Sequence, residues 1–152
     1  MYKRYIIFLV IILFSIKNSH SIENRIIVKV DNRIITSLDV LNETRYLMAL
    51  NKNLQKVSKK DMYKISLNSL IKEKIKEIEL LKNMEKLEID ENYLNQLVIS
   101  TYKRMKFQNQ NDFQNYLKSF ELNLGSVKSK IKIEALWNEL IYAKFLNKII
   151  IK

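Results

Sequence analysis

Residues 26–40, with the sequence IIVKVDNRIITSLDV, decide the fold that this chain is predicted to adopt. Apolar side chains alternate over residues 26–30 in a run rich in Val and Ile, which is typical of a β-strand. Asp31 and Asn32 follow, and both residue types tolerate the positive φ of a tight turn. Residues 34–35 then predict a short return strand. An isolated hairpin of this kind is marginally stable, so we expect it to pack on another element.

A helix is predicted directly after the hairpin. Thr36 and Ser37 offer side-chain oxygens for its first amides, and Asp39 places an acid near the positive end of its dipole. We expect this helix to reach about Leu50 and to be followed by a polar loop over residues 51–57. Apolar periodicity predicts four more helices, over about residues 58–87, 90–105, 112–120 and 125–146.

The longest of these helices shows one apolar stripe. Its residues are Leu67, Leu70, Ile71, Ile75, Ile78, Leu81 and Met84. The opposite face carries Lys72, Glu73, Lys76 and Glu77, which we interpret as solvent-exposed ion pairs. Trp137 is expected to anchor the last helix in the core.

The composition supports a mainly α fold. The chain of 152 residues contains no proline and one glycine, Gly125, whereas all-β folds need such residues at many turns. We therefore predict a bundle of about five helices with a small N-terminal β-hairpin. No cysteine is present, so a disulfide framework and a thiol nucleophile are excluded.

The first residues predict an export signal. Lys3 and Arg4 precede an apolar run over residues 5–16, and Ser19 and Ser21 place small side chains where a signal peptidase cleaves. The alternative is a membrane anchor, but twelve helical residues span only about 18 Å of a hydrocarbon core of about 30 Å. We expect cleavage after residue 21, one domain over residues 22–152, a periplasmic location in a Gram-negative bacterium and no stable membrane insertion.

Catalytic chemistry has few candidates in this sequence. The only histidine is His20, inside the predicted leader, so the mature chain lacks both His and Cys. The usual neutral general base and most zinc ligands are then missing, and we predict no enzyme activity, no metal and no cofactor. Asp90, Glu91 and Asp112 stand at predicted helix starts, where capping explains them.

The chain is strongly basic, with a formal net charge of +11. Removal of residues 1–21 leaves 24 basic and 16 acidic residues, a net charge of +8. Nucleic-acid domains concentrate Lys and Arg with aromatic residues on one element, whereas these lysines are spread over every predicted helix. We expect no nucleic-acid partner.

The ordered elements resemble the N-terminal domain of the SurA-type periplasmic chaperones. The resemblance lies in the hairpin with Asp39 and Val40, residues 67–81, residues 87–90, residues 113–117, and the Gly125 turn with residues 131–137. It covers nearly the whole mature chain. It implies a chaperone that binds unfolded or nascent secreted and outer-membrane proteins and assists their folding and assembly.

The sequence departs from that family after the last predicted helix. Family members continue there into a parvulin-type peptidyl-prolyl isomerase domain, so we expect no isomerase activity from this polypeptide. Residues 149–151 can add a third strand to the hairpin, as a C-terminal segment does in the family, or can form an apolar tail.

A chaperone needs exposed apolar and aromatic surface, and methionine suits surfaces that adapt to many partners. Eight residues are candidates for binding clients in an apolar cleft between helices: Tyr46, Met48, Met84, Tyr102, Met105, Phe107, Phe113 and Tyr116. Two alternatives stay open. One is a split isomerase whose parvulin domain lies on another chain, and the other is a basic helical bundle that docks on an envelope partner.

Overall fold

The fold begins with the hairpin that the sequence predicts. The computed structural model describes residues 24–146. Strands β1 (Ile26–Val30) and β2 (Arg33–Thr36) pair antiparallel, with an irregularity in register near the start of β1. Asp31 adopts a φ of 52° at the turn, in the left-handed region that Asp tolerates better than most residues. The hairpin prediction is confirmed, whereas residues 149–151 lie outside the described residues.

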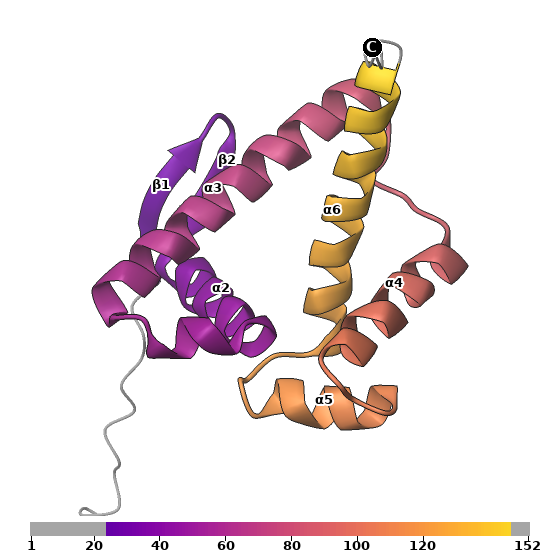
Figure 1. Cartoon of the computed structure of the whole chain (residues 1–152). Coiled ribbons are helices and arrows are strands. Elements are labelled where there is room, and N and C mark those ends of the chain that lie inside the picture. Colours follow the sequence, from indigo (N-terminus) through magenta and orange to yellow (C-terminus); the bar gives the residue numbers. More distant parts are fainter. Residues whose placement is uncertain (1–23, 147–152) are drawn as a thin grey trace, which may run out of the picture.

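Helices make up most of the rest of the described chain. They are α2 (Ser37–Leu50), the 3₁₀-helix η1 (Lys52–Lys56), α3 (Lys59–Asn83), α4 (Glu91–Arg104), α5 (Gln110–Lys118) and α6 (Leu124–Phe145). In Figure 1, α3 and α6 converge towards one end of the molecule, while α2 and α5 lie at the other end. The predicted fold class, mainly α with about five helices and an N-terminal hairpin, is confirmed.

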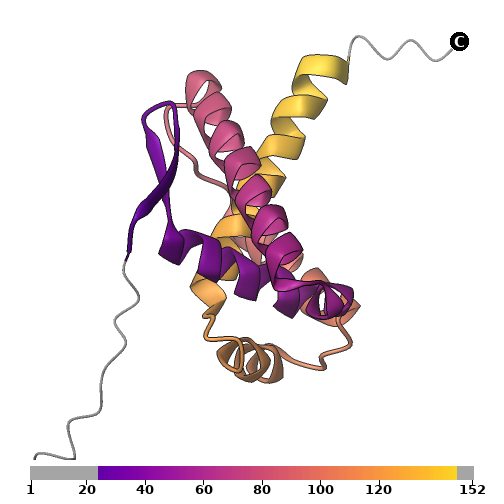
Figure 2. The same cartoon turned by 90° about the vertical axis from the view of Figure 1, so that its left-hand side faces the viewer.

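The hairpin packs on α2 and α3, as its small size requires. Ile35 is fully buried and forms a core cluster with Val40 of α2 and Leu70 of α3. Val28 and Val30 of β1 add to this cluster. Figure 2 shows the hairpin on the side of α2 and α3 that faces away from α5. Val28 and Val30 therefore lie on the face of β1 that meets the helices, whereas Ile26, which the alternation places on the same face, is exposed.

A second cluster joins α3 to α6. Leu80 of α3 is fully buried against Leu136 and Leu140 of α6. Residues from the connection between α3 and α4, including Leu87 and Ile89, cover it. This contact explains why α3 ends at Asn83 and not near Leu87: the chain turns extended at Met84 and lays its apolar side chains back on the cluster.

Helix starts are set by side-chain caps. Thr36 caps α2 in a reciprocal capping box, because Asp39 N donates to Thr36 Oγ1 at 3.2 Å and Thr36 N donates to Asp39 Oδ2 at 2.8 Å. Asn109 caps α5 and Asn123 caps α6, so both helices begin slightly before their predicted starts. The predicted loop over residues 51–57 was wrong in part, since η1 forms there.

The predicted stripe on α3 was also wrong in part. Ile75 and Leu81 are exposed, whereas Ser66 is fully buried beside Leu70. The first half of α3 packs on α2 and the hairpin, and its second half packs on α6. Because these partners meet α3 at different angles around its axis, no single stripe stays buried along the helix.

Candidate functional site

Six of the eight predicted client-binding residues lie in or against one core cluster. Its fully or almost fully buried members come from four helices and one connection: Ala49, Val98, Tyr102, Phe113, Leu117, Leu122 and Val127. Tyr46, Met105, Phe107 and Tyr116 are partly buried against it. The structure therefore places these aromatic side chains together, but mainly as packing between α2, α4, α5 and α6.

The aromatic rings of this cluster contact one another. The ring centroids of Phe107 and Phe113 lie 5.6 Å apart, and those of Phe107 and Tyr116 lie 5.0 Å apart. Such tilted pairs stabilise a core beyond the area they bury. The Tyr116 hydroxyl donates to the carbonyl of Ala49 at 2.8 Å, which satisfies its polar group inside the cluster.

The other two predicted residues lie elsewhere. Met84 packs on the cluster between α3 and α6, beside Trp137, which is half-buried there as an anchor of α6. Met48 lines a groove formed by α2, η1 and the start of α3. The eight residues do not share one surface, and Met48 alone among them lines this groove.

This hollow, which we call the α2–α3 groove, has a volume of about 650 Å³. Its lining residues are Ser37, Val40, Leu41, Thr44, Met48, Gln55, Val57, Lys59, Met62 and Tyr63. A hollow of about 350 Å³ between α2, α4 and α6, which Tyr46 helps to line, is smaller and carries Arg104, Glu134 and Glu139 in its lining. The α2–α3 groove is therefore both larger and more apolar.

Two of the polar side chains in the α2–α3 groove already have partners. The Thr44 hydroxyl lies 2.9 Å from the carbonyl of Val40 and 2.7 Å from Ser66 Oγ. Gln55 Nε2 donates to the carbonyl of Met48 at 3.0 Å. With these groups satisfied, the surface offered to a ligand is mostly apolar.

Two side chains that line the α2–α3 groove suit it to bind partners of varied shape. Met48 is partly exposed, and its flexible thioether suits partners of varied shape. Tyr63 is 44% exposed and so offers part of its side chain to a bound partner. Such a surface buries apolar side chains of a bound chain and gains free energy by removing them from water.

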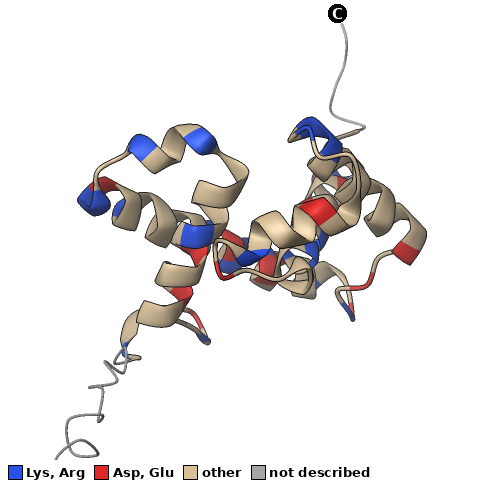
Figure 3. Cartoon of the chain, turned by 90° about the horizontal axis from the view of Figure 1, so that it is seen from below, with Lys and Arg blue, Asp and Glu red and all other residues tan. Residues whose placement is uncertain are grey.

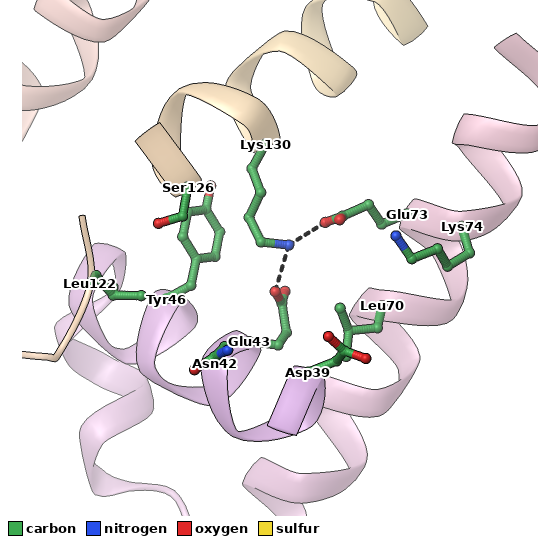
Figure 4. Close-up of a pocket in the computed structure, with 10 residues that line it drawn as sticks. All are labelled: Asp39, Asn42, Glu43, Tyr46, Leu70, Glu73, Lys74, Leu122, Ser126 and Lys130. Atoms are coloured by element: carbon green, nitrogen blue, oxygen red, sulfur yellow. Dashed lines mark hydrogen bonds and ion pairs between the residues drawn. The ribbon is translucent and has the colours of Figure 1, made fainter. Parts of the chain in front are cut away.

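A second feature is a buried group of charges between α2, α3 and α6, which we call the Lys130 cluster. Lys130 Nζ of α6 lies 2.6 Å from Glu43 Oε2 of α2 and also pairs with Glu73 of α3. Ser69 Oγ donates to Glu43 Oε1 at 2.6 Å. Figure 4 shows the three charged side chains converging on a hollow of about 160 Å³, with the Tyr46 ring beside the lysine.

The Lys130 cluster corrects one sequence interpretation. Glu73 and Lys76 were predicted to form exposed pairs along α3, but they pair across the helices with Lys130 and Glu134 of α6. Glu43 is only 2% exposed, and its carboxylate pairs with Lys130. Burial of an ion pair requires good geometry and extra hydrogen bonds. Ser69 supplies one hydrogen bond to Glu43 Oε1, whereas Glu43 Oε2 meets Lys130 as an ion pair and accepts no hydrogen bond from the part of the chain that the structure describes.

The chemistry of the Lys130 cluster favours a structural role. Burial lowers the pKa of Lys130, but Glu43 and Glu73 raise it by more, so the pKa lies above its ordinary value of 10.5. The amine is therefore protonated at neutral pH and is not a nucleophile. Within residues 24–146, no group of three or more His, Cys, Asp and Glu side chains is placed to hold a metal ion.

The surroundings of Tyr46 in the Lys130 cluster predict that the folded protein loses stability at alkaline pH. Burial, followed by the carboxylates of Glu43, Glu73 and Glu134, raises the pKa of Tyr46 well above its ordinary value of 10.0. The unfolded chain then loses this proton first, so stability falls as the pH rises above about 10. Tyr46→Phe keeps the ring without the hydroxyl and should reduce this fall by about 1 kcal/mol between about pH 9 and 11.

The measurement is the free energy of unfolding in urea at both pH values. Tyr142→Phe, at a tyrosine that is 64% exposed, is the matched control and should leave the fall unchanged. An equal fall in wild type and Tyr46→Phe would contradict the assignment.

Sequence reasoning missed both features for identifiable reasons. Val57, which lines the α2–α3 groove, lies in the segment predicted to be a loop. Met62, which also lines the groove, lies before the first residue of the apolar stripe predicted for α3. The sequence contained one indication of the Lys130 cluster. Lys130 lies on α6 between Val127 and Ile133, which are both buried, so a charged side chain stands among apolar residues of the helix.

Comparison of the chain with protein-family models, with curated proteins and with solved structures found no match. Within residues 24–146, no helix has the length and apolar character needed to cross a bilayer. The resemblance to the SurA-type chaperones stays a prediction from the sequence.

Proposed function

We propose that the protein is an exported holdase-type chaperone that binds unfolded secreted or outer-membrane proteins. The observation that carries this proposal is the α2–α3 groove, a mostly apolar hollow lined in part by exposed Tyr63 and adaptable Met48. Apolar segments of an unfolded chain have surface to bury, and this groove offers a place for them.

The proposed mechanism is binding and release without chemistry. A client segment lays apolar side chains in the groove and is kept from associating with other unfolded chains. Burial of apolar surface drives the interaction by itself, so nucleotide, metal and isomerase activity are not needed. The proposed periplasmic location depends on the leader, which lies outside the described residues.

The direct test is light scattering of a urea-unfolded outer-membrane β-barrel protein that is diluted into buffer with the purified protein. We expect aggregation to be suppressed near stoichiometric ratios, with no acceleration of prolyl isomerisation. A folded, helical preparation that leaves aggregation unchanged would contradict the holdase proposal.

A variant locates the activity in the groove. Tyr63→Glu places a charge on the apolar lining, and we expect about tenfold weaker client binding, which corresponds to a loss of about 1.4 kcal/mol of binding free energy. Tyr63 is 44% exposed, so the fold should tolerate the change. Tyr142→Glu on α6 is the matched control, because Tyr142 is also exposed and does not line the groove. Equal protection by both variants would place client binding elsewhere.

A further inference from the structure

We propose that the α2–α3 groove selects client segments in which apolar side chains are flanked by Asp or Glu. This inference rests on the proposed function and names the class of segment that the groove takes. It is carried by the charges around the groove, which come from η1 and the first turns of α3.

Positive charge is concentrated in residues 52–64, the segment of η1 and the start of α3 that forms one side of the groove, which we call its rim. Five lysines stand within residues 52–64 against a single acid, Asp61, and all five are exposed: Lys52, Lys56, Lys59, Lys60 and Lys64. Lys59 itself lines the groove. Seen from below, basic residues recur along the part of the molecule that holds η1 and the start of α3 (Figure 3).

The single acid does not neutralise this rim. The carboxylate of Asp61 accepts a hydrogen bond from Ser58 Oγ at 2.7 Å, as part of the N-terminal cap of α3. Across residues 24–146, none of the five lysines forms an ion pair with a carboxylate. Elsewhere on α3 and α6, by contrast, Lys76, Lys130 and Lys144 each pair with a glutamate.

Two properties of the site then define its ligand. The apolar lining requires apolar side chains in the middle of the bound segment, and the lysine rim favours carboxylates on either side of them. Charges at a solvent-exposed rim act mainly on association and selectivity and are screened by salt. A segment with basic flanks would bring like charges together and would bind more weakly.

The experiment compares two labelled peptides that share one apolar centre of Leu, Phe and Val. One peptide has aspartates on both sides of the centre and the other has lysines. Fluorescence anisotropy with the full chain gives both dissociation constants. At about 50 mM salt we expect the aspartate peptide to bind about tenfold more tightly, and at about 500 mM salt the ratio should fall to about two.

Matched variants assign the selectivity to the rim. Lys56→Gln/Lys59→Gln should weaken binding of the aspartate peptide about fivefold at low salt and should leave the lysine peptide no weaker. Lys103→Gln/Lys118→Gln removes the same charge from exposed positions on α4 and α5 and should change neither constant. Tyr63→Ala removes apolar lining without adding a charge and should weaken both peptides.

The outcomes separate this inference from the proposed function. Equal binding of the two peptides, with Tyr63→Ala weakening both, would overturn the charge selectivity and leave the groove as a client site. No binding of either peptide by the folded protein would contradict the proposed function itself. A third outcome is that the protein binds vesicles of anionic phosphatidylglycerol but neither peptide, and that the Lys56→Gln/Lys59→Gln variant no longer binds the vesicles. This outcome would identify a lipid surface, and not a peptide, as the occupant and would overturn the inference.

Discussion

Lys130→Met is expected to lower the free energy of unfolding by about 3–5 kcal/mol, the usual cost of removing one partner from a buried ion pair. Methionine keeps most of the apolar volume of the lysine stem, so the loss comes from the charge. Glu43, whose side chain is 1% exposed, would keep only the hydrogen bond from Ser69. Urea unfolding followed by circular dichroism measures the change.

A control and a double variant make this prediction specific. Lys86→Met removes a lysine whose side chain is 76% exposed, and it should change stability by less than about 0.5 kcal/mol. Glu43→Leu/Lys130→Met replaces both members of the pair with apolar residues and should recover much of the stability that Lys130→Met loses. A loss of under about 1 kcal/mol for Lys130→Met would show that water or another group satisfies Glu43.

Phe113→Ala should lower the free energy of unfolding by about 3–5 kcal/mol. Phe113 is fully buried, and its ring contacts both Tyr102 and Phe107, so its removal leaves a cavity between α4, α5 and α6. Because domains of this size have net stabilities of only about 5–15 kcal/mol, the variant would lose a large share of its stability. Urea unfolding gives the value.

A graded comparison distinguishes core packing from client binding at this position. Phe113→Leu leaves a smaller cavity and should cost clearly less than Phe113→Ala, while Tyr142→Ala at an exposed position should cost little. If Phe113→Leu stays folded, we expect it to bind the unfolded β-barrel client as well as wild type does. If the Phe113→Leu protein is folded but binds the client more weakly, Phe113 belongs to the client-binding surface.

The elements of the fold follow largely from local sequence. The strand over residues 26–30, the turn at Asp31 and the capping box of Thr36 with Asp39 depend on neighbours a few residues away, and all three are present in the structure. Helix ends were less well predicted. The start of α6 depends on whether Asn123 or Ser126 provides the cap, and both residue types are suitable.

The candidate sites were harder to predict than the fold. The preference for aromatic and methionine residues selected Met48, which lines the α2–α3 groove, and also Phe113 and Tyr102, which are buried. Apolar residues serve a core and a binding surface equally well, so composition and periodicity do not separate the two uses.

The sequence by itself therefore determined the class of the fold, the hairpin and the approximate helices, because hydrogen-bonding caps and apolar periodicity act within one segment. The tertiary structure alone decided which faces of α3 are buried, that Lys130 meets Glu43 and Glu73, and that Met48 and Tyr63 line one groove. Each of these depends on the angles at which helices far apart in the chain cross, and many combinations of helix faces bury similar apolar area.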